Sequence, residues 1–177
     1  MSFSVVGVGD CKVSCSADLM TYALGSCIGL MVYDPVVRIG GLLHFMLPES
    51  SISPLKAVRN PFLFADTGIP LLFRAAYRLG AEKDRMTVCA VGGAQIGDDN
   101  GVFAIGRRNT EAMRKRLSDA GVPLWAEETG GAESRTVRLE VSTGRLWVRG
   151  PGEAEREIRC ADGRLRAACW RGGMSLV

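Results

Sequence analysis

The chain has 177 residues, of which 47% are apolar and 23% charged. This composition is typical of one folded domain and not of a disordered segment. The net charge is +3 at pH 7, and the basic residues form no stripe, which argues against nucleic-acid binding. No apolar run approaches the roughly 18 residues of a membrane span, and the first residues lack the positive start of a signal peptide. We therefore expect a cytosolic protein with reduced thiols and no membrane insertion.

Short strands dominate the first third of the chain. Apolar and β-branched residues favour strands at Val5–Val8, Lys12–Ser14 and Met20–Leu24. The last of these leads into a tight turn at Gly25-Ser26-Cys27.

The next segments predict a β-hairpin. Ile28–Tyr33 and Arg38–Phe45 are apolar and flank a turn-like sequence that contains Asp-Pro. If the last residue of the first strand pairs with the first residue of the second, Cys27 lies directly opposite His44. A bulge at Gly40-Gly41 would shift this register. In the bulge-free register, the two side chains lie on one face of the sheet with Cβ atoms roughly 5 Å apart.

An amphipathic helix is expected after a loop in the middle of the chain. Pro48–Pro61 contains three prolines and several serines, which favours a loop. Asp66 or Thr67 can cap the helix that follows, and Gly80 ends it. Its buried face is predicted to consist of Ile69, Leu72, Phe73 and Ala76.

A buried strand and a second helix follow. Met86–Val91 predicts the strand, and Gly92–Gly97 is a glycine-rich loop without the lysine of a phosphate-binding loop. Asp98–Gly101 has the wrong spacing for calcium and is interpreted as a surface turn. Asn109 is a candidate cap for the second helix, Thr110–Ala120.

The last strands precede a break in the pattern. Leu124–Glu127 predicts a strand, and Thr136–Val141 with Arg145–Val148 predicts a hairpin. The pattern weakens after Gly150-Pro151-Gly152. We expect one domain over residues 1–150 and a C-terminal tail of unknown role over 151–177.

The turn and the sole histidine suggest a thiol site. A cysteine attacks as thiolate, so Cys27 needs a base or a cation, and His44 can act as either. Backbone N–H groups at Gly25 and Ser26 could stabilise an oxyanion. A third group must fix the imidazole tautomer, and Thr21 is the nearest hydroxyl on the preceding strand.

Structural roles compete with this interpretation. A lone cysteine is often a small buried residue, and a lone histidine often has a structural role. No second pair of cysteines has zinc-like spacing, so no metal site and no cofactor are expected. The remaining cysteines are Cys11, Cys15, Cys89, Cys160 and Cys169, and Cys89 is expected in the core.

Several separate motifs follow one another over about residues 5–149. They are Thr21, Leu24-Gly25-Ser26-Cys27, Tyr33-Asp34-Pro35, Gly40-Gly41, His44, Met46–Ser50, Ala65–Leu71, Gly92-Gly93-Ala94, Ile105–Asn109, Gly130-Gly131 and Arg135-Thr136-Val137. In this collinear order they resemble the chemotaxis CheD family, the chemoreceptor glutamine deamidases. The chain departs from the family at Ala132-Glu133-Ser134, where the family carries a more glycine-rich turn with an asparagine.

The resemblance implies an α/β fold of the α+β type: a single layered domain of mainly antiparallel sheets with two main helices. It implies hydrolysis of glutamine side-chain amides in methyl-accepting chemotaxis receptors to glutamate and ammonia. Cys27 matches the family nucleophile, His44 the general base and acid, and Thr21 the orienting residue. The resemblance also implies a CheC-type phosphatase as a partner.

Two other function classes stay open. The chain could be a binding module that regulates a phosphatase or receptor with little turnover. It could also be a different thiol acyl-transfer enzyme, such as a peptidase or a transglutaminase-like protein, because its thioester chemistry would be the same.

Overall fold

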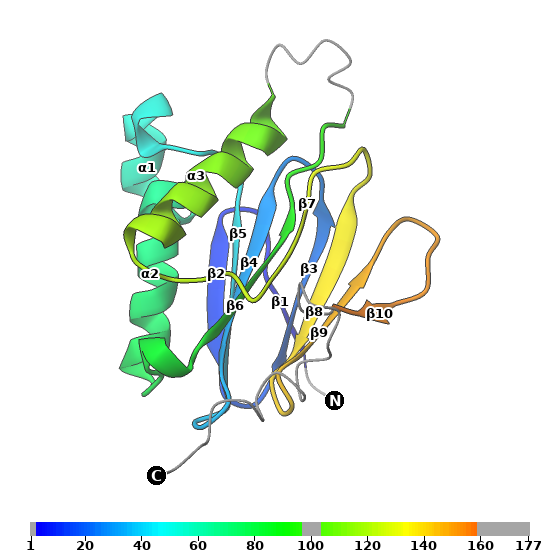
Figure 1. Ribbon diagram of the computed structural model, residues 1–177. Coiled ribbons are helices and arrows are strands. Elements are labelled where there is room, and N and C mark those ends of the chain that lie inside the picture. Colours follow the sequence, from blue (N-terminus) through cyan, green and yellow to red (C-terminus); the bar gives the residue numbers. More distant parts are fainter. Residues whose placement is uncertain (1–2, 97–103, 159–177) are drawn as a thin grey trace.

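In the part of the chain that the structure describes, two five-stranded sheets pack against each other, and helices cover the outer face of one of them (Figure 1). The computed structural model describes residues 3–96 and 104–158. The first sheet has the order β1 (Phe3–Val5), β3 (Asp18–Leu24), β8 (Arg135–Glu140), β9 (Arg145–Arg149) and β10 (Arg156–Glu157). The second has the order β2 (Asp10–Ser14), β5 (Ile39–Phe45), β4 (Ile28–Asp34), β6 (Thr87–Gly92) and β7 (Ala126–Thr129). Most neighbouring strands are antiparallel, so the predicted fold class is confirmed.

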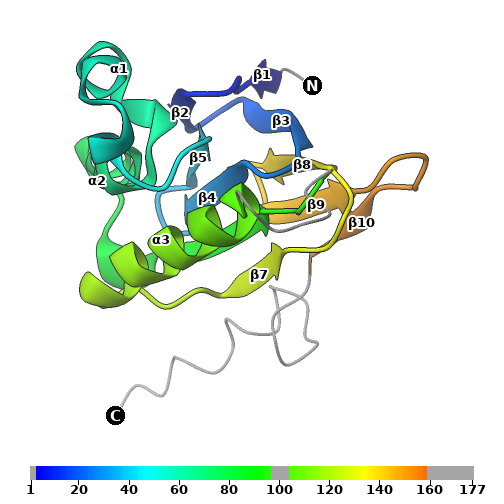
Figure 2. The ribbon, with the colours of Figure 1, turned by 90° about the horizontal axis from the view of Figure 1, so that it is seen from above.

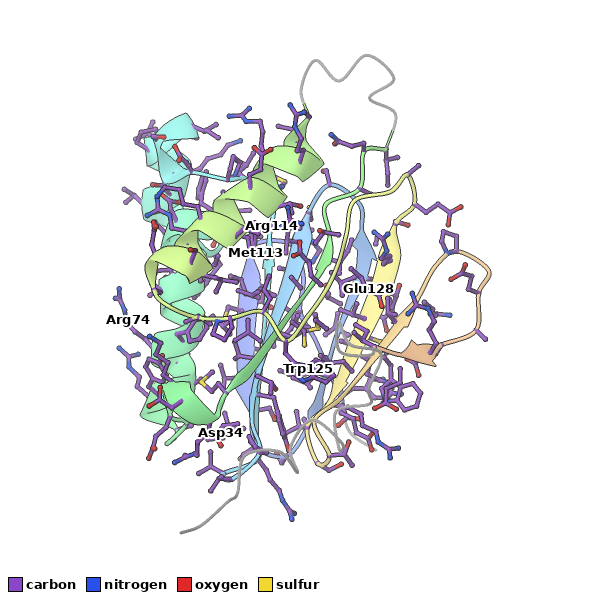
Figure 3. All side chains as sticks on the ribbon, in the orientation of Figure 1. Asp34, Arg74, Met113, Arg114, Trp125 and Glu128 are labelled. Carbon is purple, nitrogen blue, oxygen red and sulfur yellow. The ribbon has the colours of Figure 1, made fainter. Side chains whose placement is uncertain are left out.

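The second sheet is buried on both faces. Helices α2 (Ala65–Arg78) and α3 (Ile105–Asp119) cover one face and the first sheet covers the other (Figure 2). Strands β4 and β5 are therefore buried along their whole length, which explains their nearly continuous apolar sequences. Leu30 packs with the helices, whereas Met31 packs in the layer between the sheets. Met113 of α3 points toward the sheet (Figure 3).

Gly40 and Gly41 serve the packing of the layers and do not form a bulge. The β4–β5 register is continuous through both glycines. A Cβ at Gly40 would lie 2.8 Å from Leu139 Cδ2, and one at Gly41 would lie 2.8 Å from Leu72 Cδ1. Glycine thus permits the close approach of the first sheet on one side and of α2 on the other.

The buried face of α2 is confirmed, but its predicted cap is wrong. Ile69, Leu72, Phe73 and Ala76 are all buried. The helix begins at Ala65, so Asp66 and Thr67 lie inside its first turn. The Asp66 carboxylate instead accepts hydrogen bonds from the backbone N–H and the hydroxyl of Ser50, at 2.9 and 2.6 Å. The Thr67 hydroxyl donates to the Pro61 carbonyl.

The segment predicted as a loop contains short helices. Its helix α1 (Pro54–Arg59) lies between the 3-10 turns η1 (Ser50–Ile52) and η2 (Pro61–Leu63). Prolines occupy the first positions of α1 and η2, where no intrahelical N–H is needed. A further 3-10 turn, η3 (Lys83–Arg85), precedes β6.

Helix α3 begins earlier than predicted. It starts at Ile105, so Asn109 lies inside the helix and is not its cap. Ala104 occupies the capping position in a left-handed conformation and makes no side-chain cap bond.

The packed fold continues past residue 150. Strand β10 pairs with β9, and the Ile158 side chain is buried in the layer between the sheets. Glu155 forms an ion pair with Arg138 of β8 at 2.6 Å. The acidic turn at 98–101, Cys160, Cys169 and the rest of 159–177 lie outside the described residues, so the separate role of the tail stays a prediction.

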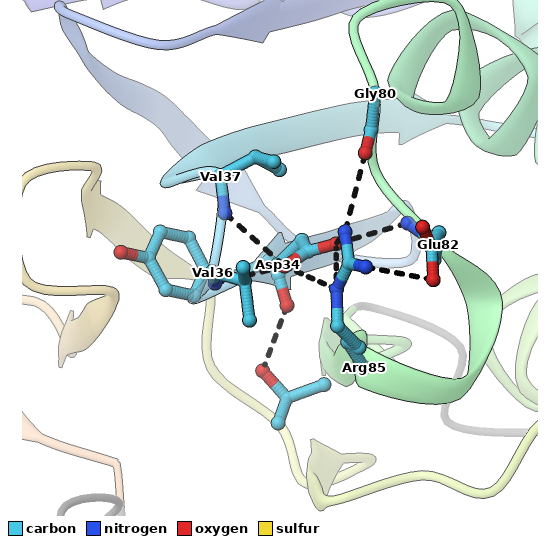
Figure 4. A network of polar contacts seen from close by, with 8 residues as sticks. Asp34, Val36, Val37, Gly80, Glu82 and Arg85 are labelled. Carbon is cyan, nitrogen blue, oxygen red and sulfur yellow. Dashed lines mark hydrogen bonds and ion pairs between the residues drawn. The ribbon is translucent and has the colours of Figure 1, made fainter.

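A buried carboxylate fixes the β4–β5 turn at the end of the hairpin away from Cys27 (Figures 3 and 4). Asp34 accepts hydrogen bonds from the Val36 and Glu82 backbone N–H groups, both at 2.9 Å. Arg85 forms an ion pair with it at 2.9 Å. Burial alone would raise the pKa of Asp34, but the hydrogen bonds from the Arg85 guanidinium and from the backbone N–H groups outweigh it and hold the pKa below its ordinary value.

Candidate active site

The hairpin register differs from the prediction. His44 pairs with Gly29 and Tyr33 with Gly40, so Cys27 is not directly opposite His44. The turn has the predicted length but lies one residue later in the chain, because Asp34 pairs with Ile39 and Arg38 takes a left-handed conformation with φ of 53° inside the turn. The shift is two residues, which preserves the face on which each side chain lies. Cys27 is therefore displaced diagonally from His44 across the pair of strands.

Thr21 and His44 meet between the two sheets. Thr21 lies on β3 of the first sheet and His44 on β5 of the second. The Thr21 Oγ1 atom and the His44 Nδ1 atom are 2.8 Å apart, and the exposed fractions of the two residues are 0% and 1%. Cys27 is half-buried and packs against the same layer. The structure thus brings Thr21 and His44 into contact and places Cys27 against the same layer, diagonally across the strand pair from His44.

The backbone of Val6 determines the imidazole tautomer. The Thr21 hydroxyl donates to the Val6 carbonyl oxygen at 2.7 Å. A hydroxyl has one proton, and a carbonyl oxygen can only accept. His44 Nδ1 must therefore carry the proton that it donates to Thr21 Oγ1, which leaves Nε2 as the unprotonated nitrogen. Nε2 is buried and has no hydrogen-bond partner among the described residues.

Gly29 provides the space that this arrangement needs. It is the residue directly opposite His44. A Cβ at this position would lie 2.9 Å from Leu24 Cδ1 and 3.6 Å from Thr21 Cγ2. Any larger residue would displace Leu24 and crowd Thr21. Sequence reasoning missed this role, because the register was needed to see it.

The resting site is electrically neutral. Burial lowers the pKa of His44 to about 4. Burial also raises the pKa of the Cys27 thiol above its ordinary value, and its own backbone N–H offsets this only in part. At neutral pH the site therefore holds a thiol and an imidazole, not a thiolate and an imidazolium. Of the two roles open to His44, this favours that of a base.

The glycine-rich loop after β6 anchors the turn that carries Cys27. The Gly93 N–H donates to the Cys27 carbonyl at 2.9 Å, and the Ala94 N–H donates to the Gly25 carbonyl at 2.8 Å. Gly92 has a φ of 119°, and a Cβ there would collide with the Cys27 carbonyl oxygen. Glycine is thus required at the contact, for reasons unrelated to nucleotide binding.

Backbone N–H groups at the turn differ in availability. The Gly25 N–H donates to the Ala23 carbonyl at 2.8 Å. Within residues 3–96 and 104–158, neither the Ser26 nor the Cys27 N–H donates to another residue. An oxyanion beside the thiol would therefore meet the N–H groups of Ser26 and Cys27, whereas that of Gly25 is already engaged.

The other described cysteines lie in different settings. Cys89 is buried in the core, as predicted. Burial and the neighbouring Asp10 raise the pKa of Cys11 to about 12. Cys15 is exposed. In the described part of the chain, no three His, Cys, Asp or Glu side chains gather as a metal site would need. No described helix is both long enough and apolar enough to span a membrane.

A cysteine beside an oriented histidine defines a class of thiol-dependent acyl-transfer and hydrolytic proteins. Comparison with known proteins is more specific. The family model for CheD chemotactic sensory transduction matches residues 46–150. The chain belongs to the CheD family.

The relatives cover most of the chain. A protein of Solibacter usitatus, described as "Probable chemoreceptor glutamine deamidase CheD", is 51% identical over 151 residues, which are 84% of this chain and 89% of that protein. A CheD 1 protein of Syntrophus aciditrophicus with the same description is 49% identical over 156 residues, 87% of this chain and 98% of that protein. A CheD 2 protein of Anaeromyxobacter dehalogenans is 49% identical over 150 residues, 84% of this chain and 94% of that protein.

Proposed function

We propose that the protein hydrolyses the side-chain amides of selected glutamines in methyl-accepting chemotaxis receptors, giving glutamate and ammonia. Membership of the CheD family supports the substrate class. The observation that carries the chemistry is the buried, hydrogen-bonded Thr21–His44 pair, which lies diagonally across the strand pair from Cys27 and whose hydrogen bonds favour an unprotonated Nε2. No cofactor enters the reaction.

The first step forms a thioester. Cys27 Sγ attacks the glutamine side-chain carbonyl carbon while His44 Nε2 accepts the thiol proton. The carbonyl oxygen becomes an oxyanion, for which the N–H groups of Ser26 and Cys27, neither of which donates to another described residue, are the candidate donors. This order of steps is consistent with a neutral thiol and a neutral imidazole in the resting site. The imidazolium and the oxyanion form only as the substrate reacts.

The second half of the reaction regenerates the thiol. His44 returns its proton to the amide nitrogen, and ammonia departs as the carbon–nitrogen bond breaks. A water molecule then attacks the thioester while His44 accepts one of its protons. The carbon–sulfur bond breaks, Cys27 regains a proton, and the receptor side chain is left as glutamate.

Thr21 orients the base throughout this cycle. Its oxygen accepts the Nδ1–H proton, and the Val6 carbonyl holds the hydroxyl proton away from the ring. The ring then cannot adopt the tautomer with a protonated Nε2 without losing this hydrogen bond. When the ring becomes imidazolium, the same bond becomes charge-assisted and stronger.

Mass spectrometry of receptor cytoplasmic fragments tests the proposal. Fragments incubated with the wild-type protein should show conversion of specific glutamines to glutamate, and Cys27→Ala should abolish it. Conversion that is equal with both proteins would contradict the proposed nucleophile. No conversion by a folded wild-type protein would favour a binding module. Transfer to an added primary amine in place of water would favour a transglutaminase-like enzyme.

We also propose a CheC-type phosphatase as a binding partner. The support is family membership alone. Titration calorimetry with a CheC-type protein from the same genome tests it, and an absence of binding at micromolar concentrations would contradict it. A partner that covers the site should also slow receptor deamidation in proportion to the bound fraction.

A further inference from the structure

A buried asparagine on α3 connects the two strand ends that carry the site. Asn109 is fully buried, with an exposed fraction of 0%. Its Nδ2 atom donates to the Ser26 carbonyl oxygen and to the Met46 carbonyl oxygen, both at 2.9 Å. Both acceptors are carbonyls, so the nitrogen and not the oxygen of the amide must face them. Ser26 immediately precedes Cys27, and Met46 follows His44 by two residues.

These contacts lie where the sheet hydrogen bonds stop. The ladder between β4 and β5 ends at the pair Ile28 and Phe45. The turn that carries Cys27 is held to β6 on one side by the Gly93 N–H. On the other side, toward the strand of His44, the Asn109 amide takes the place of the ladder. The relative position of Cys27 and His44 therefore depends on this side chain.

An asparagine at position 109 is unfavourable for the stability of the helix and the core, and packing alone does not explain why it is there. Asparagine is a poor residue for a helix interior, because its side chain competes for backbone hydrogen bonds. The buried stripe of α3 continues with Met113 and Leu117, so an apolar residue would be the ordinary choice. The Asn109 Oδ1 atom is buried and has no hydrogen-bond partner among the described residues. A buried polar atom without a partner is unfavourable.

Helix α3 has other contacts that hold it in place. Gly106 packs closely on the loop after β6, since a Cβ there would lie 2.5 Å from the Ala94 carbonyl oxygen. Met113 and Leu117 are 0% and 2% exposed and belong to the core. Loss of the Asn109 amide should therefore leave the helix docked and release the Cys27 turn.

We propose that Asn109 is a positioning residue for the deamidation reaction, which sets the distance between the Cys27 thiol and the His44 imidazole without touching either. This inference rests on the proposed function. Asn109 acts through two backbone carbonyls, so it changes neither the charge nor the tautomer of His44. Its removal should lower the rate of thiol attack and leave substrate binding unchanged.

The test compares Asn109→Leu with Met113→Leu in the full-length protein. Leucine has nearly the shape of asparagine but donates no hydrogen bond, and Met113→Leu is a volume-conserving change on the same helix face. We expect Asn109→Leu to lower kcat on receptor fragments about 10- to 100-fold, the effect of a misplacement of the order of 1 Å. KM and the acid limb of the pH profile should stay at wild-type values. Met113→Leu should change kcat less than about twofold.

A second readout separates this inference from the choice of substrate. Acylation of Cys27 by p-nitrophenyl acetate, with Cys27→Ala as the blank, reports thiol attack without a receptor. Asn109→Leu should slow it about tenfold or more if positioning is lost. If the wild type acylates but does not convert glutamine, the proposed function fails while the role of Asn109 is still measured.

Outcomes that overturn the inference are equally direct. Wild-type kcat and acylation in Asn109→Leu, with only a lower melting temperature, would assign Asn109 a purely structural role. A raised KM with unchanged kcat would assign it to substrate binding. If Asn109→Leu does not fold, Asn109→Ala is measured in its place, and the same two rates decide.

Discussion

Replacement of Thr21 by valine removes one hydroxyl from the layer between the two sheets. The shape of the side chain stays nearly the same, because a methyl group takes the place of the hydroxyl. Valine cannot accept the Nδ1–H proton of His44 or donate to the Val6 carbonyl, which the native hydroxyl does at 2.8 and 2.7 Å. His44 Nδ1 and the Val6 carbonyl oxygen would both remain buried and would lose the hydrogen bond that each makes with Thr21. The ring would also lose its preference for the tautomer with a free Nε2.

The magnitude follows from the charge on the ring. In the transition state the imidazole becomes imidazolium, and a hydrogen bond to a charged group is worth about 1.5–3 kcal/mol. Its loss should lower kcat about 10- to 150-fold. KM should stay near the wild-type value, because Thr21 has an exposed fraction of 0% and does not reach the substrate. The free energy of unfolding should also fall by about 1–3 kcal/mol, from the unpaired groups.

The assay is steady-state release of ammonia from receptor fragments, with unfolding in urea measured on the same samples. Thr21→Ser is the matched control, since it keeps the hydroxyl and should retain most of the activity. Wild-type kcat in Thr21→Val would show that the hydroxyl does not orient the imidazole. An equal loss of kcat in Thr21→Ser would also contradict that role, because packing and not the hydroxyl would then be responsible.

Three further predictions concern pH, thiol reactivity and the chain end. Because the pKa of His44 falls from about 6.5 in the unfolded chain to about 4 in the folded one, the free energy of unfolding should decrease as pH falls from 6.5 to 4, by at most about 3 kcal/mol. His44→Gln should lack this component in urea titrations across that range, and an identical slope would contradict it. Iodoacetamide at neutral pH should label exposed Cys15 faster than Cys27 in the absence of substrate, as measured by peptide mapping, and the reverse order would point to a resting thiolate. A chain that ends at Gly150 should melt at least about 5 °C below one that ends after Ile158, because it loses β10 and a buried isoleucine; equal melting temperatures would place the boundary at residue 150.

Periodicity predicted the elements of this fold better than their ends. The alternation of Val137, Leu139 and Val141 correctly predicted the buried face of β8 and of the residue that follows it. All three side chains are fully buried. Helix caps were less predictable, because the residues that cap helices also make tertiary hydrogen bonds. Asp66 binds Ser50, which lies 16 positions earlier in the chain.

Asn109 illustrates the same ambiguity in the candidate site. Its residue type fits a helix cap, but its contacts are with Ser26 and Met46, which are 83 and 63 positions away. Such contacts depend on the packing of α3 against the second sheet. No local pattern in the sequence contains that information.

The hairpin register failed for a local reason. Asp34 binds the turn N–H of Val36 and the distant Arg85, which stabilises a turn that lies one residue later than the apolar pattern suggested. The error was an even number of residues, so Cys27 and His44 stayed on the predicted face. The role of Val6 could not be predicted from the sequence. Every residue has a backbone carbonyl, so the residue type does not indicate which carbonyl accepts the Thr21 hydroxyl.

Capture of the covalent intermediate tests whether Cys27 is the nucleophile. Receptor fragment and wild-type protein are mixed, quenched in acid within one turnover, digested and analysed by mass spectrometry. We expect a receptor peptide joined through its former glutamine to the Cys27 peptide, by a thioester that neutral hydroxylamine cleaves. Glutamine conversion at the wild-type rate by Cys27→Ala, with no adduct on Cys27 in the wild type, would contradict that role.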